Sequence, residues 1–425
     1  MASAERIQGR SKTLPEHGRN WEAIRKEMLA LGKDDADWRN GRTAVYVFHP
    51  GEDVLRVAKE AYALYQSENA LGPAAFPSLR QMESDVVSMG LGLLHGPEGA
   101  TGNITSGGTE SILMAVKTSR DQARARGVDT NGAEILVPRS AHLAFDKAAH
   151  YLGLKMVRVP VAQDLRADVR AMAAAITDRT LMLVGSAPCF PYGLIDPIEE
   201  LSELAVKRDL WLHVDACVGG YFAPFARMNG VPVSPFDFEL PGVASISADL
   251  HKYGYAAKGA STIFHRTAEQ YAHQIFVCDD WPAGGMTTPT AAGTRPGGAV
   301  ASAWAVMHYL GVDGYRAKVR RVTETRERLM QAIDAMPGLR THGAPVLGLF
   351  TYGSDDPSVP IFAVWAELKK RGWFTGLVTE PRGIHLMLSP SHADVAETYL
   401  EDLADALAAV RAGAGAGGKT EARYS

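Results

Sequence analysis

Runs of apolar residues recur along the middle of the chain, and longer amphipathic stretches separate them. The apolar runs predict strands in "AEILVPRS" (133–140), "KMVRVPV" (155–161), "TLMLVGSAP" (180–188), "LWLHVDAC" (210–217) and "VASISAD" (243–249). The stretches between them predict helices at 142–153, 166–176 and 197–209. Continuous apolar strands that alternate with helices indicate an α/β fold with a mostly parallel sheet, covered on both faces. Ligand sites in such sheets lie beyond the carboxyl ends of the strands.

The chain has 425 residues, more than a single domain usually has. The patterns predict an N-terminal arm at 1–60, a large α/β domain at 61–311 and a smaller C-terminal α/β domain at 312–412. The smaller domain follows a long charged helix and has the order strand, helix, strand in "PVLGLFTYG", "PIFAVWAELKKRGW" and "GIHLMLSP". The Gly/Ala-rich segment 413–425 is expected to be a disordered tail.

Composition excludes several classes of protein. Apolar residues make up 46% of the chain and charged residues 22%, as in an ordinary globular protein. A net charge of -4 gives no reason to expect a nucleic-acid partner. Three cysteines without framework spacing suit a reducing compartment. We find no signal peptide and no membrane-spanning stretch, so we expect a cytoplasmic protein.

The segment "GNITSGGTESILMA" (102–115) is a turn that opens directly onto a helix. Free backbone N–H groups and the positive end of the helix would meet there, which suits a phosphate group. The hydroxyls of Thr105, Ser106 and Thr109 would be further donors. An ordinary helix cap is the alternative interpretation, since a glycine-rich turn alone is weak evidence.

Two charged residues lie at or just beyond the ends of predicted strands, and both could take part in catalysis. Asp215 closes an apolar strand, where a carboxylate needs a cationic partner, although a helix N-cap would also explain it. Lys252 follows the strand "VASISAD"; in a cleft it can lose its proton more easily and become a nucleophile, although most lysines are merely exposed. Together with the phosphate turn they fit pyridoxal phosphate. Asp215 would keep the pyridine nitrogen protonated, and Lys252 would bind the cofactor aldehyde covalently.

Several motifs carry a resemblance to a known family, mostly within residues 40–310: "FPSLRQME", "TSGGTESILMA", "SAHLAFDKA", "GSAPCFPYGLIDPI", "HVDACVGG", "SISADLHKYGYAAKG" and "PTAAGTRPGG". By these motifs the chain resembles the pyridoxal-phosphate enzymes of aspartate-aminotransferase fold type I, in the group II decarboxylase branch, and within it the sphingosine-1-phosphate lyases. The resemblance implies a homodimer with shared active sites at its two-fold interface.

The resemblance also implies roles around the cofactor. His142 would stack on one face of the cofactor ring, where a structural histidine is the alternative. Gly108 and Thr109 would bind the cofactor phosphate, and Thr294 would reach that phosphate from the partner subunit. His251 would help to place the lysine and contact the phosphate.

Substrate contacts are where the chain departs from the family pattern. The resemblance places the following residues on the substrate side: Tyr192, Lys258, Asn69, Phe48 and His49. The family's "Asn-x-x-His-Pro" appears as "NALGP", with Gly72 at the histidine position, and its "Val-Tyr-His" appears as "VFHP", with Phe48 at the tyrosine position. Tyr46, two residues earlier, could supply a hydroxyl. Loss of a cation and a hydroxyl would weaken binding of a dianion by about a few kcal/mol.

The resulting functional hypothesis is a pyridoxal-phosphate-dependent carbon–carbon lyase. It would cleave a 2-amino-3-hydroxy compound into an aldehyde and an amine such as phosphoethanolamine, and we expect no metal ion. An amino-acid decarboxylase is the alternative, because both reactions share the same first steps. Two hypotheses from other functional classes remain. The chain could bind the cofactor without turnover, or it could be a purely structural α/β protein.

Overall fold

The computed structural model describes residues 13–413. Two units are distinguished, one up to Asp37 and one from Trp38 onward. The first contains helix α1 (Trp21–Leu31), capped by the Asn20 side chain, and the short 3-10 helix η2 (Gly32–Asp34). Residues 1–12 of the predicted arm and residues 414–425 of the predicted tail lie outside the described residues.

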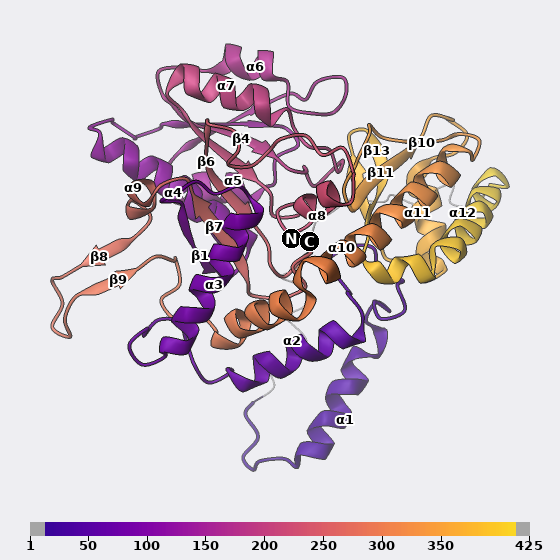
Figure 1. The fold of residues 1–425 in the computed structure, drawn as a ribbon. Coiled ribbons are helices and arrows are strands. Elements are labelled where there is room, and N and C mark those ends of the chain that lie inside the picture. Colours follow the sequence, from indigo (N-terminus) through magenta and orange to yellow (C-terminus); the bar gives the residue numbers. More distant parts are fainter. Residues whose placement is uncertain (1–12, 414–425) are drawn as a thin grey trace. The chain divides into compact units, whose positions relative to one another are not determined.

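The second unit is built around a seven-stranded sheet with the order β1-β7-β6-β5-β4-β2-β3 (Figure 1). Its strands are β1 (Thr101–Thr105), β2 (Glu134–Pro138), β3 (Lys155–Val159), β4 (Thr180–Ser186), β5 (Trp211–Asp215), β6 (Val243–Ala248) and β7 (Ser261–His265). Within this sheet β7 pairs antiparallel with both of its neighbours, and the other pairs are parallel. The predicted fold class, an α/β fold with a mostly parallel sheet, is confirmed.

Helices cover both faces of this sheet. The crossover from β2 to β3 contains α5 (Ala144–Leu152), while those from β3 to β4 and from β4 to β5 contain α6 (Val169–Ala175) and α7 (Ile198–Arg208). The crossover from β2 to β3 runs toward one edge of the sheet, and the other two run toward the opposite edge. Right-handed crossovers in opposite directions place their helices on opposite faces. Helix α4 (Gly108–Ala125) packs against α5 and therefore shares its face.

The sequence pattern missed two strands at one side of the sheet. β1 reads "TGNIT" and was expected as part of a turn, and β7 reads "STIFH". β1 contains two threonines, an asparagine and a glycine, so it lacks the apolar run by which a buried strand is found. Both strands are nevertheless held by the sheet, since β7 pairs along its length with β1 and β6.

A second, four-stranded antiparallel sheet follows in the C-terminal part, with the order β10-β11-β13-β12. Its elements are β10 (Leu339–Thr341), β11 (Leu349–Ser354), α11 (Ile361–Lys370), β12 (Gly376–Thr379), β13 (Arg382–Met387), η3 (Pro390–Asp394) and α12 (Ala396–Arg411). The long helix α10 (Gly297–Asp334) leads to it and is kinked at Gly311, whose φ is 53°. The kink falls at the predicted domain boundary, and the division into domains itself stays a prediction.

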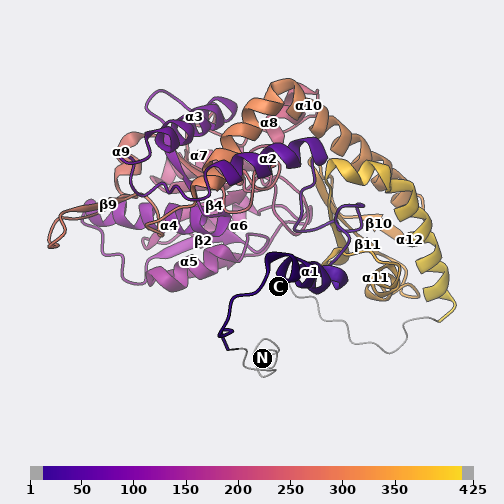
Figure 2. The same ribbon diagram turned by 90° about the horizontal axis from the view of Figure 1, so that it is seen from below.

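Helix α2 (Glu52–Leu64) lies along the first part of α10 (Figure 1 and Figure 2). The contact is close because α10 begins with glycines; a Cβ on Gly298 would lie 2.7 Å from the Tyr62 carbonyl oxygen. The remaining elements are α3 (Pro77–Leu93), α8 (Ala223–Met228), α9 (Ala268–Ala272) and the hairpin of β8 (Phe276–Cys278) and β9 (Met286–Thr288). None of the helices in residues 13–413 combines the length and the apolar run that crossing a membrane requires.

Candidate active site

A cavity of about 320 Å³ lies where several strands of the large sheet end. Asp215 is the last residue of β5, and Lys252 follows β6. His142 follows β2, and the amino end of α4 supplies Gly108 and Thr109. The parallel pairing of β5 with β6 aligns Asp215 with Ser247, so both strands deliver their next residues to the same place. The structure therefore brings together six of the predicted cofactor residues, His251 included.

The turn before α4 forms one wall of this cavity. A Cβ at Gly108 would lie 2.8 Å from both the Asp249 Oδ1 atom and the Cys217 Sγ atom, so only glycine fits here without a shift. Glu110 holds the turn, because its Oε2 accepts a hydrogen bond from the Ser106 backbone N–H at 2.6 Å. The Thr105 hydroxyl, expected as a phosphate donor, is buried and bonded to Ser111 at 2.6 Å, so this expectation is wrong.

Lys252 is paired with a carboxylate that the sequence reasoning overlooked. Its Nζ atom lies 2.9 Å from the Asp249 Oδ2 atom, and the Asp249 side chain is only 2% exposed. Burial alone would lower the pKa of Lys252, but the charge of Asp249 outweighs it and the pKa is raised. The expectation that Lys252 loses its proton easily is therefore wrong for this state of the protein. The pKa of Asp249 is lowered in turn: its burial acts against this, and the nearby charges of Lys252 and His251 prevail.

Asp215 and His142 complete the walls. Asp215 Oδ1 accepts hydrogen bonds from the Cys217 backbone N–H at 3.1 Å and from the Ser247 hydroxyl at 3.4 Å. His142 Nδ1 accepts from the Ala144 N–H at 3.1 Å, which leaves its proton on Nε2. Burial lowers the pKa of His142, although the charge of Asp215 opposes this shift, so His142 is a neutral flat ring in the cavity.

His251 is fixed by its backbone neighbour. Its Nδ1 lies 2.7 Å from the Ala260 carbonyl oxygen and donates to it, while its Nε2 lies 3.6 Å from Asp249 Oδ2. Burial lowers the pKa of His251, and the charge of Asp249 acts in the opposite direction. The ring lies beside the turn, where a Cβ placed on Gly107 would be 3.7 Å from its Cε1 atom.

Three predicted site residues line neither this cavity nor the second one described below. Tyr192 is buried, and its hydroxyl donates to the Glu380 carbonyl oxygen at 2.5 Å. Asn69 accepts a hydrogen bond from the Leu71 N–H at 3.1 Å, which makes it a local turn residue. Thr294 is exposed to solvent in the single chain. Their roles stay predictions.

A second cavity, of about 310 Å³, holds the other predicted substrate residues. Phe48, His49 and Lys258 line it, together with residues of α2. His251 lines both this cavity and the first, so the two are neighbours.

Lys258 is held by backbone carbonyls and by an aromatic ring. Its Nζ atom donates to the carbonyl oxygens of Tyr46 at 3.0 Å and His251 at 3.3 Å. It also lies 5.5 Å from the centre of the Phe48 ring, within the range of a cation–π contact. Phe48, at the family's tyrosine position, therefore supports Lys258. Although the residue as a whole is exposed, desolvation of the ammonium group and the charge of Lys252 lower its pKa to about 8.

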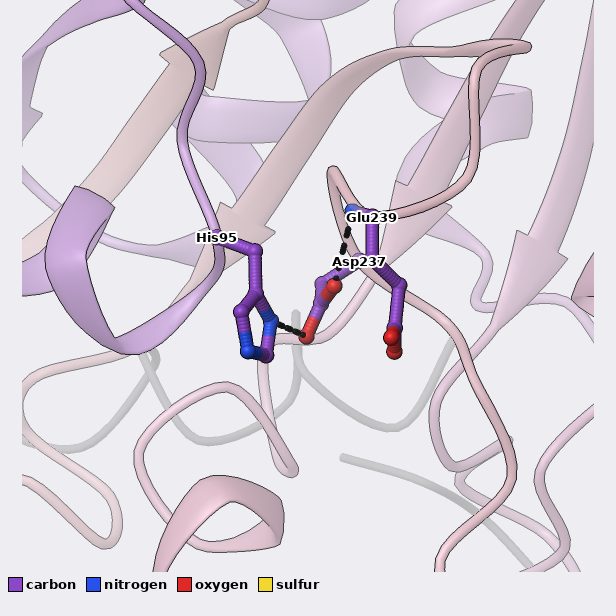
Figure 3. A group of neighbouring side chains, drawn as sticks. All are labelled: His95, Asp237 and Glu239. Carbon is purple, nitrogen blue, oxygen red and sulfur yellow. Dashed lines mark hydrogen bonds and ion pairs between the residues drawn. The ribbon is translucent and has the colours of Figure 1, made fainter.

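A separate cluster of possible metal ligands contains His95, Asp237 and Glu239 (Figure 3). His95 Nδ1 lies 3.0 Å from Asp237 Oδ2. Arg227 already occupies the space between the carboxylates, 2.9 Å from Glu239 and 3.5 Å from Asp237. Because this guanidinium balances one of the two negative charges, the cluster is an ion-pair network, and we assign no metal to it.

Three residues of the first cavity with ionisable side chains were missed from sequence: Asp249, Cys217 and Glu110. Asp249 stands three residues before Lys252, across a turn in which the Lys252 N–H donates to the Asp249 carbonyl oxygen at 3.3 Å, and that spacing could have indicated an ion pair. Glu110 Oε1 accepts from the backbone N–H groups of Ala291 at 2.8 Å and Ala292 at 3.3 Å. This contact between segments 181 positions apart leaves no mark in the sequence.

Comparison with known proteins assigns the class. Residues 7–339 match the pyridoxal-dependent decarboxylase conserved domain, and the chain belongs to this family. It is similar to the sphingosine-1-phosphate lyase of Oryza sativa, with 41% identity over 92% of this chain and 73% of the rice protein. It is also similar to that of Mus musculus, with 38% identity over 93% of this chain and 70% of the mouse protein. The chain is thus a sphingosine-1-phosphate lyase-like member of the family and a pyridoxal-phosphate-dependent lyase.

A solved structure agrees with this assignment, and a more distant one shares the fold. The sphingosine-1-phosphate lyase of Burkholderia pseudomallei K96243 superposes with a TM-score of 0.91 at 36% identity, over 97% of this chain and 96% of that one. Lactobacillus brevis glutamate decarboxylase, at 21% identity, has a TM-score of 0.82 over 96% and 97% of the two chains and shares the fold.

The cavity fits pyridoxal phosphate. Asp249 Oδ1 is buried without a hydrogen-bond partner among the described residues, which is costly unless a bound group or water satisfies it. The glycine turn keeps a space that a Cβ at Gly108 would obstruct. A lysine, a buried aspartate and a neutral histidine surround that space, and this set suits the aldehyde, the ring nitrogen and the ring face.

Proposed function

We propose that the substrate of this lyase is a phosphorylated 2-amino-3-hydroxy compound of the sphingoid-base type. The enzyme would break the bond between the amine-bearing carbon and the hydroxyl-bearing carbon, releasing an aldehyde and phosphoethanolamine. The observation that carries this proposal is the 41% identity over 92% of the chain to a protein named for this substrate. Lys258, in a cavity next to the cofactor cavity, supports it.

The residues of the first cavity would divide the work. Bound there, pyridoxal phosphate supplies the electron sink for the bond that breaks. Asp215 would hold a proton at the ring nitrogen, His142 would cover one ring face, and Lys252 would bind and release the cofactor aldehyde. Gly108 and Thr109 would hold the cofactor phosphate, and His251 would position Lys252 and contact the phosphate. Tyr192 and Asn69 would act from the substrate side.

The alternative reaction, decarboxylation of an amino acid, uses the same residues up to bond cleavage. A probable L-tyrosine/L-aspartate decarboxylase of Methanothrix thermoacetophila is 36% identical over 84% of this chain. The bond that breaks is the one held perpendicular to the ring, and the position of the substrate's far end determines it. Lys258 is therefore the residue on which the choice between these reactions depends.

The proposal includes a homodimer in the cytoplasm, in which Thr294 of one subunit reaches the cofactor phosphate of the other. Support comes from the loop before it: Glu110, which lines the cavity, accepts hydrogen bonds from Ala291 and Ala292. The same loop continues to Thr294, which is exposed in the single chain and free to meet a partner.

A product assay tests the reaction. The enzyme loaded with pyridoxal phosphate (the loaded enzyme) is incubated separately with sphingosine 1-phosphate, unphosphorylated sphingosine, and aromatic and acidic amino acids. Both aldehyde and CO₂ are measured. We expect a long-chain aldehyde from the phosphorylated base and none from a Lys252→Ala variant. Release of CO₂ from an amino acid, with no aldehyde from either sphingoid base, would refute the proposal.

A further inference from the structure

The second cavity is lined by several basic residues. Two lysines and two histidines line it: Lys59, Lys258, His49 and His251. Of the described residues that line it, none is acidic. A cavity of about 310 Å³ with this lining favours an anion, since nothing inside it neutralises the ammonium groups.

His49 provides an independent sign of a ligand. The residue is 7% exposed, and its Nδ1 atom is buried with no hydrogen-bond partner among the described residues. Its Nε2 faces outward to Glu52 at 3.7 Å. Burial lowers the pKa of His49, and the charge of Glu52 opposes this shift. A neutral ring carries one proton, and in the tautomer that has it on Nδ1 this atom donates to a bound oxygen. A buried polar atom without a partner is costly unless a ligand or water satisfies it.

Of the two lysines that line the second cavity, Lys59 has no hydrogen-bond or ion-pair partner among the described residues. It lies on α2, which packs closely on α10 and is thereby fixed at the edge of the cavity. Its outer side borders a surface groove with Glu52, Asp53 and Glu60, yet it forms no hydrogen bond or ion pair with any residue of the described chain. Its three N–H donors are thus available to a ligand.

We propose that Lys59 is a specificity-determining residue that binds the phosphate end of the substrate together with Lys258 and His49. The inference rests on the proposed lyase function and assigns a cation that the family resemblance does not provide. Gly72 stands where the family has a histidine, and Lys59 supplies a positive charge in its place. Because His251 lines both cavities, one molecule can place its amine at Lys252 and its phosphate at Lys59.

The number of donors selects a phosphate monoester over a carboxylate. Lys258 uses two of its three N–H groups on backbone carbonyls and retains one. With this group and the three of Lys59, the cavity offers four charged N–H donors to a dianion with three terminal oxygens. A carboxylate has two oxygens and a single charge and would use fewer of these donors.

The test compares Lys59→Gln with Lys207→Gln in the loaded enzyme. Lys207 is an exposed lysine on α7 that lines neither cavity, so its loss controls for the change in net charge. For the phosphorylated sphingoid base we expect KM to rise about tenfold or more in Lys59→Gln, as for loss of a charge-assisted hydrogen bond, with kcat within about twofold. For the unphosphorylated base KM should not change. Lys59→Arg should retain most of the affinity.

Three results would contradict the role proposed for Lys59. Equal effects of Lys59→Gln on phosphorylated and unphosphorylated bases, or no effect on either, would overturn the assignment. A rise in KM confined to an acidic amino acid would show that the subsite takes a carboxylate and would overturn it as well.

A binding measurement separates this inference from the lyase function. If the wild-type enzyme cleaves no amino alcohol, the proposed function fails, but calorimetric binding of inorganic phosphate to the loaded enzyme still reports on the subsite. We expect binding to wild type and to Lys207→Gln, and about tenfold weaker binding to Lys59→Gln. Identical binding by all three proteins would reject the role of Lys59 by itself.

Discussion

The ion pair between Asp249 and Lys252 predicts how fast the cofactor becomes attached to the protein. Only the uncharged amine of a lysine can attack an aldehyde, and in the cofactor-free protein Asp249 keeps Lys252 charged. The change Asp249→Asn removes this charge and preserves the side-chain shape. Burial then dominates and lowers the pKa of Lys252, which raises the fraction of uncharged amine at a given pH.

The size of the effect follows from the distance. Two unit charges about 4 Å apart near a protein surface interact by about 4 kcal/mol, and the pair here is at 2.9 Å with the Lys252 side chain 22% exposed. Discounting for this exposure, we take about 3 kcal/mol, or about two pKa units. The rate of attachment at pH 8 should therefore rise about a hundredfold in Asp249→Asn.

The assay mixes cofactor-free protein with pyridoxal phosphate, traps the product with borohydride at successive times and quantifies labelled Lys252 by peptide mass spectrometry. The wild-type rate should increase about tenfold per pH unit between pH 7 and 9, while the variant should level off at a lower pH. Asp237→Asn serves as control, because Asp237 is a buried carboxylate near the other end of β6. An unchanged or slower rate in Asp249→Asn would mean that Asp249 assists proton removal, and the reasoning would be refuted.

Other predictions concern the same two cavities. Gly108→Ala should weaken pyridoxal phosphate binding at least about tenfold, read from cofactor absorbance in a titration, because its Cβ would lie 2.8 Å from Asp249 and Cys217. Lys258→Ala should raise KM for the phosphorylated base and leave KM for the unphosphorylated base unchanged in steady-state assays. Since the pKa of Lys252 is raised, the stability that its ion pair gives the cofactor-free protein is complete below about pH 10 and is lost as the pH rises through the folded-state pKa. Thermal unfolding of wild type and Lys252→Met should therefore differ at pH 7 and converge at high pH. Glu110→Gln should speed backbone hydrogen exchange at Ala291 and Ala292 by at least about fivefold, measured by mass spectrometry, because their acceptor loses its charge.

The sequence predicted those parts of the fold and site that depend on local pattern. Five strands of the large sheet have long apolar runs, and each was found within a few residues of its bounds. Asp215 and Lys252 could be placed because Asp215 ends one strand and Lys252 stands shortly after the next, and parallel strands bring their ends together. β1 and β7 were missed because β1 is polar and β7 has only two consecutive apolar residues, and pairing with neighbouring strands holds both.

What the sequence could not provide were contacts between distant segments and their electrostatic effect. The rule that a cleft lysine has a lowered pKa failed for Lys252, where Asp249 is the nearer influence, and held for Lys258, which has no carboxylate partner among the described residues. Likewise, Phe48 looked like a lost hydroxyl, but its ring faces the Lys258 ammonium. Lys59 gave no signal at all, since an exposed lysine on a helix is unremarkable until its cavity is seen.

The most direct test of the account is to find which lysine carries the cofactor. Lys252 and Lys258 border neighbouring cavities, and Lys258, with its pKa lowered to about 8, is the more easily deprotonated of the two in the cofactor-free protein. The enzyme is loaded with pyridoxal phosphate, reduced with borohydride, digested and mapped by mass spectrometry. The account predicts the phosphopyridoxyl group on Lys252 and an unmodified Lys258. A label on Lys258, with Lys252 unmodified, would contradict it.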